Sequence, residues 1–238
     1  MIEAVLFDGD QTLWDFERVM RDALMATAAE LRGARPGPFT DALGWQDLQA
    51  DRADVARQRP DVWSLAELRV LGFARTLARR RVAEGGHEAA DGELARVLGD
   101  SYFTHRDRDP ALFADTIPAL DALRAEYRLG LLSNGSRLPE TVGLASYFES
   151  VVFAQDHRVA KPDRGIFEVV QRELALGPEV CVLVGDHPVN DVAGAHGAGW
   201  RSVWLDRDGA VAFPADGPRP DAVVSALTEL PEVLHGLG

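Results

Sequence analysis

The segment VLFDGDQTLWD, from Val5 to Asp15, runs an apolar stretch directly into two closely spaced carboxylates. Residues 2–7 are mostly apolar and β-branched or aromatic, a pattern that predicts a strand buried on both faces. Asp8 and Asp10 follow two residues apart, so in extended chain both side chains leave on the same side. Gly9 between them adds no side chain.

Two carboxylates in this position need a compensating charge. At a separation of about 4 Å they repel by roughly 4 kcal/mol at an effective dielectric constant near 20. A proton, solvent or a cation relieves that repulsion, and a divalent metal is the obvious candidate. The alternative is that Asp8 and Asp10 only begin a turn, with Thr12 capping the segment that follows.

Composition narrows the classes of function. The chain has 238 residues, 46% of them hydrophobic, and a formal net charge of −13. This charge argues against nucleic-acid partners and anionic membranes, because no diffuse positive field is available to attract phosphates. The first residues lack the pattern of a signal peptide, and no stretch approaches the roughly 18 apolar residues of a membrane span. We therefore expect a cytoplasmic protein that acts on a small molecule.

The hydrophobic periodicity divides the chain into two domains. Residues 17–109 show the three-and-four spacing of amphipathic helices, with helices expected over 41–57, 65–81 and 91–103. Beyond residue 110 strands and helices alternate, with strands expected at 128–132, 151–153, 180–184, 202–205 and 222–224. This alternation predicts an α/β core with a parallel sheet, formed by residues 1–16 and 110–238, and a helical domain, 17–109, inserted into it.

The strands of such a sheet present ligand-binding groups at their carboxyl ends. The second strand is followed by Ser133, Asn134 and Gly135, before a helix expected over 139–145. A hydroxyl, and backbone N–H groups at the start of a helix, suit a phosphate. A strand that ends in an ordinary Ser-Asn-Gly turn is the alternative.

Lys161 is the only lysine among 25 basic residues. Pro162 disfavours helical geometry at Lys161, so the side chain projects from extended backbone, while Asp163 caps the next helix. In a chain that otherwise uses arginine, a single lysine indicates a position that needs a compact ammonium. The alternative is a solvated surface side chain.

Two further aspartates follow the apolar run CVLVG. Asp186 is well placed as another oxygen ligand for a hard cation such as Mg²⁺. Asp191 is either an acceptor that orients Lys161 or a metal-bound water, or a residue of an ordinary helix start.

These motifs, taken in order, resemble the haloacid dehalogenase (HAD) superfamily of hydrolases. The resemblance rests on DxDxT at Asp8–Thr12, the strand ending in Ser133, Lys161 before proline, and GDxxxxD at Gly185–Asp191, and it covers the whole chain. It implies a Rossmann-like, doubly wound parallel sheet with a helical C1-type cap domain inserted after the first motif.

The resemblance also implies roles for the site residues. Asp8 is the expected nucleophile, forming an aspartyl-phosphate, and Asp10 the general acid and base. The Asp8 side chain, the Asp10 backbone carbonyl and Asp186 are the expected Mg²⁺ ligands. The groups expected around the phosphoryl oxygens are Thr12, Ser133, Asn134, Gly135 and Lys161.

One position departs from the family pattern, which often has glycine where Gln11 stands. We expect Gln11 to keep ordinary backbone angles and to narrow the opening beside Asp10. Trp14 and Phe16 either stack on a base or sugar of the substrate or pack at the entry to the inserted domain.

The function expected from these observations is a Mg²⁺-dependent phosphatase of a small phosphorylated metabolite, with a nucleoside monophosphate as one candidate. A phosphotransferase or phosphomutase would use the same residues. A 2-haloacid dehalogenase would need neither Asp10 nor Asp186, and a phospho-acceptor signalling domain would not need the helical insert.

Overall fold

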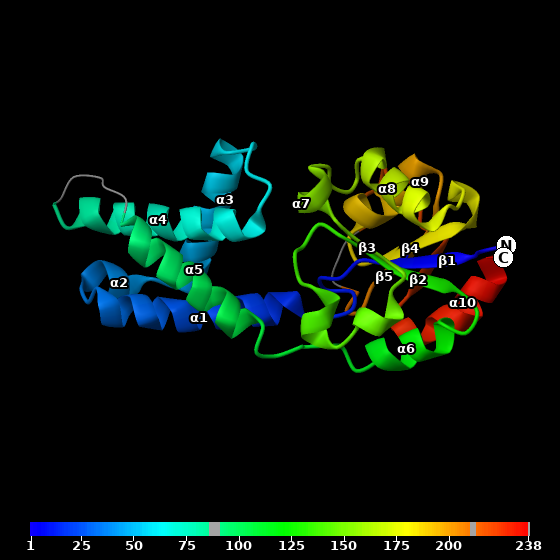
Figure 1. The fold of residues 1–238 in the computed structure, drawn as a ribbon, viewed down its shortest axis with the longest axis horizontal. Helices are drawn as coiled ribbons and strands as arrows, with labels where there is room; N and C mark the ends of the chain where they lie inside the picture. The colour runs from blue at the N-terminus through cyan, green and yellow to red at the C-terminus, as the bar shows by residue number, and fades with distance from the viewer. Residues whose placement is uncertain (86–90, 210–212, 238) are drawn as a thin grey trace. The chain divides into compact units, whose positions relative to one another are not determined.

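The computed structural model describes residues 1–85, 91–209 and 213–237. The chain forms two compact units, one of residues 1–16 and 110–238 and the other of residues 17–109 (Figure 1). The first holds all strands of the sheet described below, and the second is helical. Within the described residues no helix is long and apolar enough to cross a membrane.

The first unit is built on a six-stranded parallel sheet in the order β3-β2-β1-β4-β5-β6. The strands are β1 (Ala4–Phe7), β2 (Arg128–Ser133), β3 (Ser150–Phe153), β4 (Cys181–Gly185), β5 (Arg201–Leu205) and β6 (Ala222–Val224). The strand order reverses direction at β1, which lies between β2 and β4. The predicted Rossmann-like sheet is therefore confirmed, and the carboxyl end of β1 lies at the switch point where such sheets bind ligands.

Helices cover both faces of this sheet, as the near-continuous apolar strands predict. Val5 and Phe7 of β1 pack into the hydrophobic cluster on one face, and Ala4 and Leu6 into the cluster on the other. Successive strand residues point to opposite faces, so β1 contributes to both layers of the core. The covering helices are α6 (Thr116–Leu123) and α10 (Leu230–Leu237) on one face, and α8 (Arg164–Leu174) and α9 (Gly194–Ala198) on the other (Figure 1).

The helical unit differs from its prediction at one boundary. Its helices are α1 (Phe16–Ala34), α2 (Pro38–Ala42), α3 (Trp45–Gln58), α4 (Leu65–Ala83) and α5 (Gly92–Arg106). The helix expected over 41–57 is confirmed as α3 from Trp45 onward, but it does not begin at residue 41, because Leu43 is extended and separates α2 from α3. The Gly44 N–H donates to Asp47 Oδ2 at 2.9 Å, and this bond caps the new helix.

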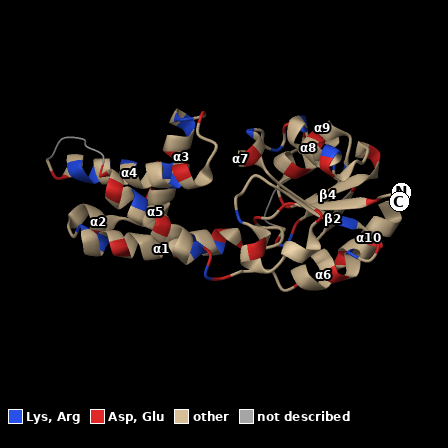
Figure 2. Cartoon of the chain, in the orientation of Figure 1, with Lys and Arg blue, Asp and Glu red and all other residues tan. Residues whose placement is uncertain are grey.

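An ion pair between a buried carboxylate and a partly exposed arginine joins α3 to α4 in this unit. Asp51, 2% exposed, accepts from Arg79 Nη1 at 2.8 and 2.9 Å and from Thr76 Oγ1 at 2.7 Å. Elsewhere on these helices acidic and basic residues are interspersed (Figure 2). The helical unit therefore neutralises its buried carboxylate internally.

The helix expected over 139–145 is also wrong. The chain forms two short 3₁₀ turns instead, Pro139–Val142 and Ala145–Tyr147, because Gly143 adopts a φ of +77° between them. The predicted Asp163 cap is confirmed, since its side chain accepts from the Gly165 N–H at 2.7 Å.

Gln11 does not have the ordinary backbone angles expected of it. Its φ is +62°, in the left-handed region, and its N–H donates to the Trp14 carbonyl at 2.8 Å. The tight turn after Asp10 imposes this conformation, so the glycine common at this position in the family has a backbone reason. A side chain in this region costs about 1–2 kcal/mol relative to glycine.

Replacing Gln11→Gly should therefore raise the free energy of unfolding by about 0.5–1 kcal/mol, after the larger entropy that glycine loses on folding is subtracted. Urea unfolding followed by circular dichroism measures the change. Ala175→Gly is the matched control, because Ala175 has a φ of +54° at the end of α8 and should show a similar gain. A loss of stability in Gln11→Gly alone would show that contacts of the glutamine side chain outweigh the backbone term.

Candidate active site

Three aspartates meet at the carboxyl ends of β1 and β4. Asp8 follows β1, Asp186 follows β4, and Asp191 lies in the π-helical segment η4 (Pro188–Ala193). One carboxylate oxygen of each lies within 4.8 Å of the others. The sheet therefore brings together side chains that the sequence places in distant motifs.

Lys161 lies between two of these carboxylates. Its Nζ donates to Asp8 Oδ1 at 2.8 Å and to Asp191 Oδ1 at 2.6 Å, and the residue is 4% exposed. The solvated-surface alternative for this lysine is therefore wrong. Asn134 holds the lysine backbone from both sides, since its Oδ1 accepts from the Lys161 N–H at 2.9 Å and its Nδ2 donates to the Lys161 carbonyl at 3.0 Å.

Burial and crowding shift the protonation equilibria of this cluster. Burial, followed by the Asp191 and Asp10 carboxylates, raises the pKa of Asp8 to about 8 despite the nearby ammonium. Burial and then Asp191 raise the pKa of Asp186 to about 6. Burial alone would lower the pKa of Lys161, but Asp191 and Asp8 outweigh it and raise that pKa above its usual value.

The donor set fits a hard divalent cation. Three carboxylates and one ammonium leave two formal negative charges in a buried position, all on oxygen atoms. Both oxygens of Asp191 already accept, Oδ1 from Lys161 and Oδ2 from the His187 N–H at 2.9 Å. Asp8 and Asp186 are therefore the better placed carboxylate ligands, and Asp191 is better placed to orient Lys161.

Asp10 lies outside the group of three carboxylates. Its Oδ1 accepts from Trp14 Nε1 at 2.7 Å, although the carboxylate is near enough to raise the pKa of Asp8. The predicted coordination through its backbone carbonyl stays a prediction. A turn does form after Asp8, as the alternative interpretation expects, since the Gly9 carbonyl accepts from the Leu13 N–H at 2.9 Å. The Asp8 side chain, however, binds Lys161 and so does more than begin this turn.

Three glycines leave space for the side chains of this site. A Cβ on Gly9 would lie 2.4 Å from the Trp14 ring, and one on Gly135 would lie 2.6 Å from Asp10 Oδ2. A Cβ on Gly185 would lie 2.3 Å from the Asp191 carboxylate. Contacts this short would force the functional side chains out of place.

The loop after β2 differs from its prediction. The Gly135 N–H donates to Ser133 Oγ at 3.0 Å, and the next helical turn begins only at Pro139. The helix start expected directly after this loop is therefore wrong, and phosphate binding by the backbone N–H groups of the loop stays a prediction. Ser133 lies buried at the end of β2, beside Asn134, and its contact with substrate stays a prediction.

Thr12 is fully buried, and within the described residues its Oγ1 has no hydrogen-bond partner. Its backbone carbonyl accepts from Arg207 Nη2 at 2.9 Å, and Arg207 pairs with both oxygens of Asp115 at 2.9 and 3.1 Å. This ion pair fastens the loop after β1 to the start of α6. Sequence reasoning missed both residues, although the WLDR segment that follows the last motif contains Arg207.

Trp14 does not stack on a substrate. Its side chain is fully buried in the sheet core, and Phe16 is partly buried against the same cluster. A second indole also contacts the site, since Trp204 Nε1 donates to the Asp186 carbonyl at 2.8 Å.

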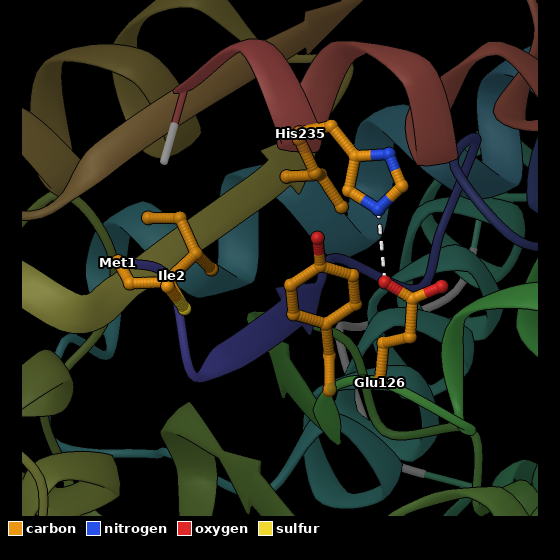
Figure 3. A pocket seen from close by; sticks show the side chains of 6 residues that line it. Met1, Ile2, Glu126 and His235 are labelled. Carbon is orange, nitrogen blue, oxygen red and sulfur yellow. Dashed lines mark hydrogen bonds and ion pairs between the residues drawn. The ribbon is translucent and has the colours of Figure 1, made fainter.

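A cavity of about 250 Å³ lies away from these residues (Figure 3). It is lined by Met1, Ile2, Glu126, Tyr127, Leu234 and His235. Its residues precede β1 and β2 or belong to α10, so it lies at the amino-terminal edge of the sheet, where His235 Nε2 and Glu126 Oε2 form a hydrogen bond of 2.8 Å. It is therefore separate from the acidic cluster.

Comparison with known proteins identifies the family of this chain and several of its relatives. A family model described as haloacid dehalogenase-like hydrolase matches residues 2–199. Human N-acylneuraminate-9-phosphatase is 34% identical over 99% of this chain and 95% of its own length. Phosphoserine phosphatase of Thermus thermophilus is 33% identical over 71% of this chain and 68% of its own. A 2-haloacid dehalogenase structure from Pseudomonas syringae pv. Tomato DC3000 has a TM-score of 0.80 and 30% identity over the full length of both chains.

The raised carboxylate pKa values predict that Mg²⁺ binding releases protons and weakens as the pH falls. The ligands bind metal in their ionised form, so protonation of Asp8, with a pKa of about 8, and of Asp186, with a pKa of about 6, competes with the cation as the pH falls. Titration calorimetry in buffers of different ionisation enthalpy measures both effects. Asp186→Asn should lose most of the affinity, whereas a wild-type affinity independent of pH across these two pKa values would contradict the assigned ligands.

Proposed function

Because this chain belongs to the haloacid dehalogenase-like hydrolase family, we propose that it is a Mg²⁺-dependent phosphatase that forms an aspartyl-phosphate on Asp8. Two of the relatives named above are phosphatases, and they support the assignment of this chain as a phosphoric monoester hydrolase. The observation that carries the proposal is the contact of Lys161 with Asp8 inside a buried acidic cluster at the switch point of the sheet. That arrangement places a fixed carboxylate oxygen beside a fixed positive charge.

The residues of the site divide the proposed reaction into two displacements. A carboxylate oxygen of Asp8 attacks phosphorus, and the bond from phosphorus to the leaving oxygen breaks while Asp10 gives that oxygen a proton. Water then attacks the phosphorus of the aspartyl-phosphate and gives a proton to Asp10. The bond between phosphorus and the Asp8 oxygen breaks, so phosphate is released and the Asp8 carboxylate is restored. Lys161 offsets the negative charge around the transferring group.

Mg²⁺ held by Asp8, Asp186 and the Asp10 carbonyl would supply further positive charge for the phosphoryl oxygens. We assign four further residues to the phosphoryl pocket: Thr12 in the loop after β1, Ser133 at the end of β2, and Asn134 and Gly135 directly after it. Asn134 acts through the backbone of Lys161. The helical unit, residues 17–109, is the proposed cap that excludes water during the first displacement.

The proposed substrate is a small phosphate monoester. The burial of Trp14 weakens the case for a nucleotide, because this ring is not available to stack on a base. Phosphoserine and N-acylneuraminate 9-phosphate, the substrates named for the two relatives, belong with nucleoside monophosphates in the first set of compounds to test.

A 2-haloacid dehalogenase is the second candidate, favoured by the structural neighbour at 30% identity. In that reaction the carboxylate attacks carbon and displaces halide, and water attacks the resulting ester. No leaving oxygen needs a proton, so Asp10 and Asp186 would have no role. Their presence in the site favours phosphoryl transfer.

The first test is release of inorganic phosphate from a panel of phosphate monoesters with and without Mg²⁺, with halide release from 2-haloacids measured in parallel. The wild-type chain should release phosphate only with the metal, and Asp8→Asn should lower turnover by at least about 10³-fold while keeping the fold. The exposed Asp216→Asn is the matched control. Halide release without phosphate release, or near-normal turnover in Asp8→Asn, would overturn the proposal.

Lys161→Arg should lower kcat by about 10²-fold or more without changing the net charge. A planar guanidinium does not fit where one nitrogen atom contacts two buried carboxylates at 2.6 and 2.8 Å. Steady-state kinetics on the best substrate of the panel measures the effect. The exposed Arg164→Lys on α8 should keep full activity, and full activity in Lys161→Arg would refute the role of the ammonium.

A further inference from the structure

Trp14 contacts the proposed general acid rather than the substrate. Its Nε1 donates to Asp10 Oδ1 at 2.7 Å, and the indole is fully buried among the apolar residues on one face of the sheet. A tryptophan N–H is a donor only, so it fixes which carboxylate oxygen faces it.

The indole itself is held in place from several directions. Gly9 leaves the space that the ring fills, since a Cβ there would lie 2.4 to 3.2 Å from three ring atoms. The Trp14 backbone pairs with Asp10 and with Leu112 through isolated bridges, and its carbonyl accepts from the Gln11 N–H at 2.8 Å. The donor therefore has a fixed position relative to Asp10.

The opposite oxygen of Asp10 is also located. A Cβ on Gly135 would lie 2.6 Å from Oδ2 and 3.1 Å from Cγ, so the carboxylate lies against the backbone of that loop. Together with the indole contact at Oδ1, this fixes both the position and the rotation of the carboxyl plane. A group that must deliver a proton along one direction gains rate from such fixation.

We propose that Trp14 is a positioning residue that orients the Asp10 carboxyl for proton exchange with the leaving group and with water. The inference rests on the proposed function, in which Asp10 is the general acid and base. In the first displacement a proton passes from the Asp10 carboxyl to the leaving oxygen as the phosphorus–oxygen bond breaks.

The test compares kcat/KM across phosphate esters whose leaving groups need different amounts of protonation. An alkyl phosphate needs a proton on its leaving oxygen, whereas 4-nitrophenyl phosphate releases a stable anion. Trp14→Phe should lower kcat/KM for the alkyl ester by about 10- to 100-fold, a part of the roughly 10²–10⁴ that a positioned acid contributes. The value for the nitrophenyl ester should change by less than about threefold, because that step barely uses the acid.

Trp200→Phe is the matched control. Trp200 is 3% exposed, packs on Phe167 at 5.2 Å between ring centroids on the other face of the sheet, and its Nε1 has no partner in the described part of the chain. This variant loses an indole N–H and core volume but should keep the wild-type ratio between the two esters. Equal losses on both esters in Trp14→Phe would show a merely structural role and overturn the inference.

A second variant separates the N–H from the ring. Site-specific replacement of Trp14 by benzothienylalanine substitutes sulfur for the N–H and keeps the bicyclic shape, so it tests the donor even where Trp14→Phe fails to fold. The same selective loss on the alkyl ester is expected, and an unchanged ratio overturns the inference. A wild-type chain inactive on every ester would instead refute the proposed phosphatase, which distinguishes the two failures.

Discussion

The contact between the Lys161 ammonium and the carboxylates of Asp8 and Asp191 is the interaction on which the site depends. It joins three segments, the end of β1, the loop before α8 and η4, at one edge of the sheet. An unpaired buried charge would cost several kcal/mol, so each partner requires the others. Asn134 extends the arrangement to the loop after β2 by holding the lysine backbone.

Without a bound cation or substrate, the same cluster lowers the stability of the fold, because it holds more negative than positive charge away from solvent. The raised pKa of Asp8 shows that ionising this carboxyl is unfavourable there. A bound cation or a substrate phosphate would each change the net charge of the cluster. Sites of this kind sacrifice stability for chemistry, and the surrounding structure holds them in place. Here the Arg207–Asp115 ion pair holds the backbone at Thr12 in place. Three glycines leave the space that Trp14, Asp10 and Asp191 occupy.

The sheet and the meeting of the acidic motifs could be predicted because both follow from where strands end. An apolar strand followed by Asp8, and a second followed by Asp186, place their carboxylates at one edge of any parallel sheet. The break between α2 and α3 and the conformation of Gln11 could not be predicted, since local capping and a tight turn override propensity there.

Side-chain contacts between segments distant in the sequence could not be predicted either. Arg207 with Asp115, and Asn134 with the Lys161 backbone, depend on side-chain directions that no spacing reveals. The sequence left Trp14 between stacking on a substrate and packing at the entry to the inserted domain, for a related reason. Its burial and the space left by Gly9 show that it packs inward and contacts Asp10.

The most direct measurement of the central claim, that Asp8 attacks phosphorus, is the stereochemical course of hydrolysis with a substrate chiral at phosphorus through oxygen isotopes and sulfur. Two successive in-line displacements, first by Asp8 and then by water, predict net retention of configuration in the released thiophosphate. Net inversion would show that water attacks the substrate directly, and it would contradict the role of Asp8 as nucleophile.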